Sequence, residues 1–387
     1  MIPLAIPDLS GNESRYLQEC IDSTFISSVG PFVTRFEAAV ASACGASRAV
    51  ATASGTSGLH AALTALGVGR GELVITPSFT FIATANAIAH CGADPWLFDM
   101  EPGSWTLDPV QVEESLEWEA EERPEGVFHQ KTGRRVAAIL PVYTLGTPAA
   151  MDRLARLARR YRLPLLADAA AALGATFLGD PVGKLGADLT VFSFNGNKTV
   201  TCGGGGAVAG QDAETVDLVR HLTTTARRGA DYTHDRVGFN YRMTALQAAV
   251  GCAQLERLEH LVGAKRRIRA RYDAAFADHP RLSLFPQPPD RESACWLSGV
   301  VVYDADSEAM AALRQQLLQE EIDVRPFWKP VHLQQPFAHA PQAALPVTDG
   351  VWGHVLTLPC SAALTQEDQE RVILAVQRAL ERGAGAA

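Results

Sequence analysis

A lysine and an aspartate each follow an apolar segment of this chain. Lys198 lies in the sequence VFSFNGNKTVTCGGGG at residues 191–206, between a run of β-forming residues and four glycines. Asp168 ends the apolar run LLAD at residues 165–168. A lysine amine can form a Schiff base with an aldehyde, and a carboxylate can keep a pyridine nitrogen protonated so that the ring accepts electrons. The two residues therefore predict pyridoxal 5′-phosphate chemistry, with Lys198 and Asp168 as the catalytic pair.

Lysines are scarce in this sequence, which adds weight to Lys198. Only five lysines occur, among 34 lysines and arginines in total. A solvated surface lysine is the alternative interpretation. A lysine next to an apolar run in an arginine-dominated chain favours the catalytic role.

A short run of small polar residues is the candidate phosphate site. The sequence SGTS at residues 54–57 ends an expected strand and begins an expected helix. Backbone N–H groups at a helix start attract anions, so we expect Gly55, Thr56 and Ser57 to bind the cofactor phosphate. Serine and threonine are also ordinary helix N-caps, so the run is informative only together with the catalytic pair. Ser193, at the end of another expected strand, is a further candidate phosphate ligand.

An aromatic side chain is expected to lie flat on the cofactor ring. Phe79 and Phe81 both follow an expected strand, in the sequence PSFTF at residues 77–81. Core packing is the alternative for Phe79, and we assign the stacking role to Phe81.

Two glycine-containing segments resemble nucleotide-binding motifs without matching them. Residues 179–184 (GDPVGK) have three residues between the glycines where a P-loop has four, and no Ser or Thr follows the lysine. The glycines at 203–206 follow Lys198 and lead into an expected strand. We expect them to let the backbone pass close to the cofactor.

Short β-rich segments alternate with helical ones between residues 48 and 209. This alternation predicts an α/β fold with a mostly parallel seven-stranded sheet and helices on both faces. The last strand is expected to run antiparallel, because only residues 203–206 separate it from its predecessor. Functional residues should gather where the strands end. The expected strands are residues 49–53, 73–76, 95–98, 136–140, 164–167, 189–193 and 207–209, with helices at 57–66, 84–90 and 149–161 among them.

At 387 residues the chain is long enough for two domains. We predict a large cofactor-binding domain over residues 1–245 and a smaller C-terminal α+β domain over residues 246–387. One long amphipathic helix at residues 244–278 is expected to connect them. The polar run 119–135 predicts a surface loop or a small hairpin.

Composition argues against several classes of protein. A net charge of −9 disfavours a surface for nucleic acid or an anionic membrane. No segment reaches the roughly 18 apolar residues of a membrane span, and the first residues lack the pattern of an export signal. The seven cysteines are scattered without a C-x-x-C pair. They predict reduced thiols in a cytoplasmic protein, with no metal site.

Several long motifs together resemble the sugar aminotransferases of the DegT/DnrJ/StrS family over nearly the whole chain. The resemblance implies the aspartate aminotransferase fold of type I pyridoxal phosphate enzymes, in a homodimer whose active sites lie between the subunits. It implies that Asn240 reaches the phosphate of the neighbouring subunit's cofactor, and that Arg242 and His332 lie near the substrate. The motifs are residues 29–37 (VGPFVTRFE), 54–57 (SGTS), 77–84 (PSFTFIAT), 193–198 (SFNGNK), 238–243 (GFNYRM) and 325–332 (RPFWKPVH).

Within this family, residues 131–141 and 195–201 look like the enzymes that make UDP-linked 4-amino sugars for bacillosamine and legionaminic acid. This likeness implies transfer of an amino group from L-glutamate to a UDP-4-keto-6-deoxy-N-acetylhexosamine, in lipopolysaccharide or another surface glycan pathway. A GDP-perosamine-type 4-aminotransferase and a dTDP-sugar 3-aminotransferase are the alternatives. The sequence leaves the nucleotide and the aminated carbon open.

Two positions depart from the family pattern. Many relatives have Gln, Glu or His where this chain has Ala171, and Glu where it has Gly204. If a hydrogen bond to the cofactor's phenolic oxygen is lost, the cost is about 1 kcal/mol. Two other functions are a sugar 3-dehydratase, in which histidine replaces the lysine, and a non-catalytic regulator or binding module. The intact Lys198 and Asp168 argue against both.

Overall fold

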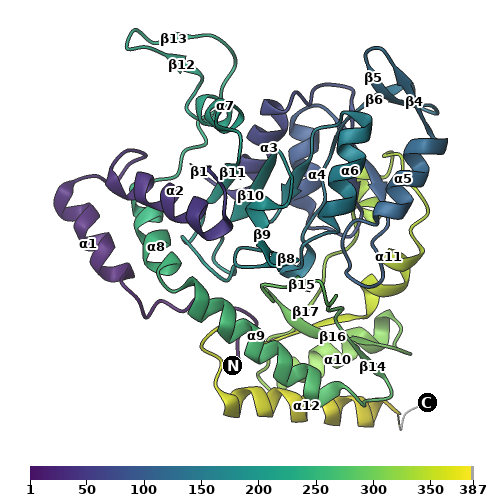
Figure 1. The fold of residues 1–387 in the computed structure, drawn as a ribbon. Coiled ribbons are helices and arrows are strands. Elements are labelled where there is room, and N and C mark those ends of the chain that lie inside the picture. The colour runs from purple at the N-terminus through teal and green to yellow at the C-terminus, as the bar shows by residue number, and fades with distance from the viewer. Residues whose placement is uncertain (385–387) are drawn as a thin grey trace.

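The computed structural model describes residues 1–384 and is built around a seven-stranded sheet (Figure 1). A four-stranded sheet and three strands of a five-stranded sheet form it, joined by parallel bridges between Ile139 and Leu165 and between Val142 and Asp168. Among these seven strands, all neighbours run parallel except β11, which is antiparallel to both of its partners. The mostly parallel sheet and its antiparallel strand are therefore confirmed. The order is β1 (Arg48–Thr52), β11 (Gly206–Gly210), β10 (Leu189–Ser193), β7 (Leu166–Asp168), β6 (Arg134–Ile139), β2 (Leu73–Pro77) and β3 (Asp94–Phe98).

Side chains of the strands alternate between two apolar cores. In β1, Ala49 and Ala51 belong to one buried cluster and Val50 to another. In β2, Ile75 belongs to the same cluster as Ala49 and Ala51, and Val74 belongs to the cluster of Val50. Successive side chains of a strand point to opposite faces, so a sheet covered on both faces needs nearly continuous apolar strands.

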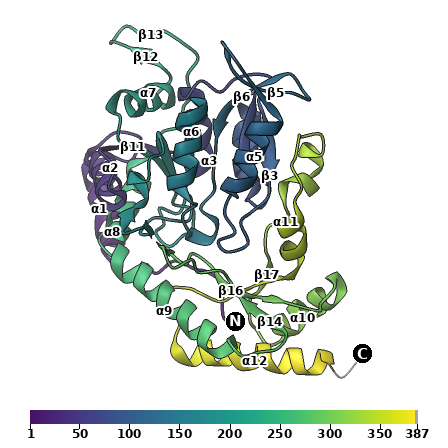
Figure 2. The same cartoon turned by 45° about the vertical axis from the view of Figure 1, so that its right-hand side comes forward.

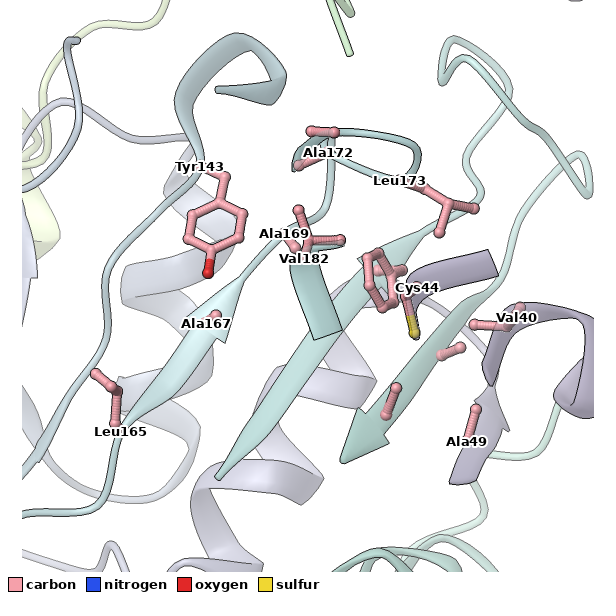
Figure 3. Close-up of a cluster of buried hydrophobic side chains, with 14 of the residues drawn as sticks. Val40, Cys44, Ala49, Tyr143, Leu165, Ala167, Ala169, Ala172, Leu173 and Val182 are labelled. Atoms are coloured by element: carbon pink, nitrogen blue, oxygen red, sulfur yellow. The ribbon is translucent and has the colours of Figure 1, made fainter. Parts of the chain in front are cut away.

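Helices cover each face of the sheet. The first core is closed by α1 (Glu13–Ser23), α2 (Pro31–Cys44), α5 (Pro109–Trp118), α6 (Met151–Tyr161) and α8 (Ala245–Leu255). The second is closed by α3 (Gly55–Ala65), α4 (Ile82–His90) and α7 (Ala213–Thr223). Figure 3 shows part of the first core, where Val40 and Cys44 of α2 lie near Ala49.

The C-terminal part of the chain forms a smaller unit around a four-stranded antiparallel sheet. Its strands are β14 (Leu282–Leu284), β16 (Ser298–Val302), β18 (Val355–Leu358) and β17 (Arg325–Pro326), in that order. The helices α9 (Leu258–Phe276), α10 (Ser307–Gln319) and α12 (Gln366–Ala384) lie around this sheet (Figure 2). They share an apolar core with its strands. Ile2 also lies in this core, and its N–H donates to the carbonyl of Glu321 at 2.7 Å.

The single helix expected at residues 244–278 is wrong. The structure has two helices, α8 and α9, with a break at Glu256 and Arg257. Arg257 leaves helical geometry and forms a 2.9 Å ion pair with Asp8, while Glu256 accepts a 2.5 Å hydrogen bond from Tyr16. Tertiary bonds to the N-terminal segment thus redirect a chain whose local pattern favours continuing the helix. Because α8 packs on α1 and α2, the domain boundary at residue 245 stays a prediction.

Two hairpins extend from this body. Residues 119–135 contain β4 (Ala120–Arg123) and β5 (Gly126–His129), which confirms the hairpin expected there. A second pair, β12 (Arg227–Arg228) and β13 (Thr233–His234), lies at the end of an arm that projects from the molecule between α7 and α8 (Figures 1 and 2). Within residues 1–384, no helix has both the length and the apolar character that crossing a bilayer requires.

Gly206 generates a prediction about folding, because it begins β11 where the strand passes the turn before α3. A Cβ at this position would lie 2.5 Å from the carbonyl carbon and oxygen of Ser54, which are backbone atoms that cannot rotate away. We expect Gly206→Ala to lower the free energy of unfolding by about 1–3 kcal/mol in urea denaturation.

Gly350→Ala is the matched control. A Cβ at Gly350 would meet nothing within 4 Å, and the residue lies in the short helix α11 (Pro346–Val351). This variant should be neutral or gain about 0.5–1 kcal/mol. Equal stabilities for the two variants would contradict the close approach at Gly206.

Candidate active site

A pocket of about 340 Å³ opens at the carboxyl ends of the parallel strands. Asp168 ends β7, Ser193 ends β10, and the turn at residues 53–56 follows β1. Gly204 and Gly205 lie at the same edge because they enter the antiparallel strand β11. A parallel sheet gathers the ends of its strands at one edge, which is where such folds bind ligands.

Asp168 is buried in this pocket and held by two hydrogen bonds. Thr84 Oγ1 donates to Oδ2 at 2.7 Å, and the N–H of Ala170 donates to Oδ1 at 3.1 Å. Thr80 in turn shares a 2.9 Å hydrogen bond with Thr84. Burial raises the pKa of Asp168, while these hydrogen bonds and the positive charge of Lys198 oppose the rise. The carboxylate therefore favours a positively charged ligand group at this position.

Lys198 lies in the same pocket, against the ring of Trp296. Its Nζ is 3.6 Å from the ring centroid, and the indole Nε1 of Trp296 donates to the carbonyl of Asn197 at 2.8 Å. Burial lowers the pKa of Lys198 to about 8, with the charge of Asp168 acting in the opposite direction. More of this amine is neutral at physiological pH than in an exposed lysine, as a nucleophilic role requires.

Two of the three phosphate ligands predicted at the N-terminus of α3 line the pocket. Gly55 and Thr56 line the pocket, together with Ser193. Ser57 does not, because its hydroxyl accepts from the N–H of Ser54 at 2.9 Å while its own N–H donates to Ser54 Oγ at 3.0 Å. This reciprocal capping box fixes the helix start. A Cβ on Gly55 would lie 2.9 Å from that of Ser193, so glycine allows the two phosphate candidates to approach.

The two candidate stacking residues take different positions. Phe81 is half-exposed and lines the pocket, with its ring centroid 6.0 Å from that of Trp328. Phe79 is fully buried against Trp105 and Phe327. Phe79 is therefore a core residue, and stacking by Phe81 stays a prediction.

Three residues that the resemblance placed near the ligands lie outside the pocket of their own chain. Asn240 and Arg242 are exposed, and their backbones form bridges with Thr224 and Thr52. His332 has both ring nitrogens occupied: Nδ1 is 2.7 Å from Ser78 Oγ, and Nε2 is 3.1 Å from Asp349 Oδ1.

The two departures from the family pattern both fall in the pocket wall. Ala171 and Gly204 line it, and a Cβ on Gly204 would lie 3.3 Å from Gln247 Nε2. Tyr143 also lines the pocket, but its buried hydroxyl has no hydrogen-bond partner and is directed toward Ala167 in the core (Figure 3). It does not replace the polar group absent at position 171.

Several residues of the site have no individual signal in the sequence. Thr80 and Thr84 lie within the motif at residues 77–84, but only the structure shows that they connect to Asp168. Trp296 and Trp328 come from the C-terminal unit and reach the pocket through tertiary packing. Across residues 1–384, no three His, Cys, Asp or Glu side chains are grouped so as to hold a metal ion.

Residues 7–377 match the sequence model of the DegT/DnrJ/EryC1/StrS aminotransferase family. The chain belongs to this family. It is 37% identical to a GDP-perosamine synthase from Caulobacter vibrioides, with 98% of both chains covered. It is 34% identical to the putative pyridoxal phosphate-dependent aminotransferase EpsN of Bacillus subtilis, over 96% of this chain and 94% of that one. The crystal structure of the aminotransferase TlmJ from Streptoalloteichus hindustanus has a TM-score of 0.88, 27% identity and 99% coverage of both chains. The expected family and fold are confirmed.

The hydrogen bond from Thr84 to Asp168 generates a second prediction. Thr84→Val keeps the side-chain shape and removes the donor, so the buried carboxylate loses a bond worth about 1.5–3 kcal/mol. We expect a loss of this size in the free energy of unfolding of the cofactor-free protein at neutral pH. Losing a donor raises the pKa of Asp168 further, so the loss should shrink as pH falls and the carboxyl becomes protonated.

Thr76→Val provides the control for this pH dependence. Thr76 is buried and donates to the carbonyl of Leu140 at 2.9 Å, which is a neutral acceptor. Its replacement should cost about 1 kcal/mol at neutral pH and the same amount at lower pH. A Thr84→Val effect that is equally independent of pH would show that Thr84 does not support an ionised Asp168.

Proposed function

We propose that this chain is a pyridoxal 5′-phosphate-dependent aminotransferase that moves the amino group of L-glutamate to a nucleotide-linked 4-keto-6-deoxy sugar. The observation that carries the proposal is the presence of Lys198 and Asp168 in one pocket at the strand ends. Membership of an aminotransferase family supports the reaction class. The proposal includes a cytoplasmic location and a product used in a surface glycan such as lipopolysaccharide.

The residues of the pocket fit pyridoxal 5′-phosphate. When bound, this cofactor supplies an aldehyde that combines with amines and a ring that accepts electrons from a neighbouring carbon. Lys198 offers an amine with a lowered pKa, and Asp168 offers a buried carboxylate for the protonated ring nitrogen. Gly55 and Thr56 offer the start of α3 to the phosphate, and Ser193 adds a hydroxyl.

The chain's own groups then perform three tasks. Asp168 holds a positive charge on the ring through a charge-assisted hydrogen bond, and Thr84 keeps the carboxylate oriented. Lys198 Nζ accepts the proton from the α-carbon of glutamate, and in the second half-reaction it returns a proton to the sugar carbon that receives the amine. The rings of Trp296, Trp328 and Phe81 line the pocket and limit the access of water.

Two nucleotide sugars compete as the amino acceptor. A GDP-linked 4-keto-6-deoxyhexose is favoured by the 37% identity to a GDP-perosamine synthase. A UDP-linked N-acetylhexosamine is favoured by the likeness of residues 131–141 and 195–201 to the UDP-4-amino-sugar enzymes. Initial rates with glutamate and matched GDP, UDP and dTDP 4-keto-6-deoxy sugars decide between them, and the position of the new amine on the product separates C4 from C3 transfer.

Lys198→Ala tests the reaction itself. The variant lacks both the amine that combines with the cofactor and the carrier of the proton. We expect turnover with glutamate and a keto sugar to fall by several orders of magnitude, since each role alone contributes at least about 10²-fold.

Lys184→Ala is the control, because Lys184 is exposed and does not line the pocket. Wild-type protein should be yellow and should lose this colour with glutamate, whereas Lys198→Ala should not respond. Near-normal amination by Lys198→Ala rules out the proposed role, and a wild-type protein that takes up no cofactor indicates a binding module.

The active protein is a homodimer in this proposal, with Asn240 of one subunit completing the site of the other. The exposure of Asn240 outside its own pocket supports this arrangement. Lys198→Ala and Asn240→Asp should each be nearly inactive alone, the second because a carboxylate repels the phosphate. Mixed dimers contain one intact site, so co-expression should restore roughly a quarter of wild-type activity. If Asn240 served its own chain, the mixture would stay inactive.

A further inference from the structure

Trp296 makes two contacts with the segment that carries Lys198. The face of its ring lies under the amine, with 3.6 Å from Nζ to the ring centroid. Its Nε1 donates at 2.8 Å to the carbonyl of Asn197, the residue before the lysine. One side chain from the C-terminal unit therefore fixes both the backbone next to Lys198 and the reactive end of that residue.

The backbone of Trp296 is itself anchored on both sides. Its N–H donates to the carbonyl of Leu145 at 3.0 Å. Its carbonyl accepts a 3.1 Å hydrogen bond from Nζ of Lys265, a buried lysine of α9. An ammonium in an apolar core is costly unless it is hydrogen-bonded, so Lys265 strongly favours the observed position of the Trp296 carbonyl.

We propose that Trp296 is a positioning residue for Lys198: its ring holds the amine in place and stabilises the protonated form, and Lys265 holds Trp296 in turn. The inference rests on the proposed function, in which Lys198 accepts and returns a proton. A ring face attracts an ammonium and has much less attraction for a neutral amine. The contact therefore favours the state in which Lys198 carries the proton, in a pocket whose burial favours the neutral state.

This interpretation differs measurably from simple core packing. A ring that only packs against Lys198 shields the amine from water, so replacing it should leave the pKa of Lys198 unchanged or raise it. A ring that stabilises the ammonium keeps the pKa of Lys198 above the value that burial alone would produce. Replacing the ring with an aliphatic side chain that still covers the amine should then lower this pKa further.

The experiment measures the ionisation of Lys198 in cofactor-free protein. Trace acetylation with acetic anhydride across a pH series, read at the peptide containing Lys198 by mass spectrometry, gives the fraction of neutral amine. Trp296→Leu should lower the pKa, with a change between about twofold and thirtyfold in the ionisation constant. Trp296→Phe keeps a weaker ring and loses the bond to Asn197. The pKa of Lys198 in this variant should therefore lie between its values in Trp296→Leu and in the wild type.

Two more variants complete the test. Lys265→Met removes the donor to the Trp296 carbonyl and should shift the pKa of Lys198 in the same direction as Trp296→Leu, by less. Trp118→Leu is the control, because Trp118 is 77% exposed at the end of α5 and should leave this pKa unchanged. If Trp296→Leu does not fold, by circular dichroism, Trp296→Phe and Lys265→Met decide the outcome.

A pKa of Lys198 that is unchanged or raised in the folded Trp296 variants would overturn the proposal. Acetylation needs neither cofactor nor sugar, so this result is independent of whether the enzyme aminates a nucleotide sugar. The proposed function can fail while the lysine still responds to the ring, and the ring can prove irrelevant while amination continues.

Discussion

The burial of one carboxylate constrains much of this structure. Asp168 ends the short strand β7, at the centre of the sheet, and its charge is removed from water. Such a group is costly unless donors and a positive charge surround it. Thr84 and the N–H of Ala170 provide the donors, and Lys198 provides the charge. A ligand with a protonated ring nitrogen would complete this arrangement better than the protein does alone.

Small residues give this carboxylate a pocket instead of a packed core. Gly206 lets β11 pass against the turn before α3, and Gly55 lets the start of that helix approach Ser193. Ala170 and Ala171 leave space beside Asp168, where larger side chains would fill the pocket. The same strands are tightly packed a few residues earlier, so the cavity is limited to their carboxyl ends. Local residue size therefore determines where the sheet is open.

The sequence predicts the parts of the site that local chemistry determines. Lys198, Asp168 and Ser193 stand next to apolar strands, so the strand pattern alone places them at one edge of a parallel sheet. The expected helix start also predicts Ser57 as a phosphate ligand, but its hydroxyl completes a capping box with Ser54, a choice that depends on the side-chain rotamer. The break between α8 and α9 depends on Asp8, almost 250 residues away, and no local pattern contains that information.

Residues from the second core are the hardest to predict, although they complete the pocket. Trp296 and Trp328 belong to the C-terminal unit, and their rings are 5.8 Å apart. Their position depends on how that unit packs against the sheet, and this packing includes the N-terminal Ile2 as well as α9. Lys198 thus follows a strand of the large sheet, whereas its aromatic neighbour Trp296 belongs to the core of the C-terminal unit. A shift between the two units would change the surroundings of Lys198 without altering the strand ends that present it, so the chemistry of the amine depends on the alignment of both.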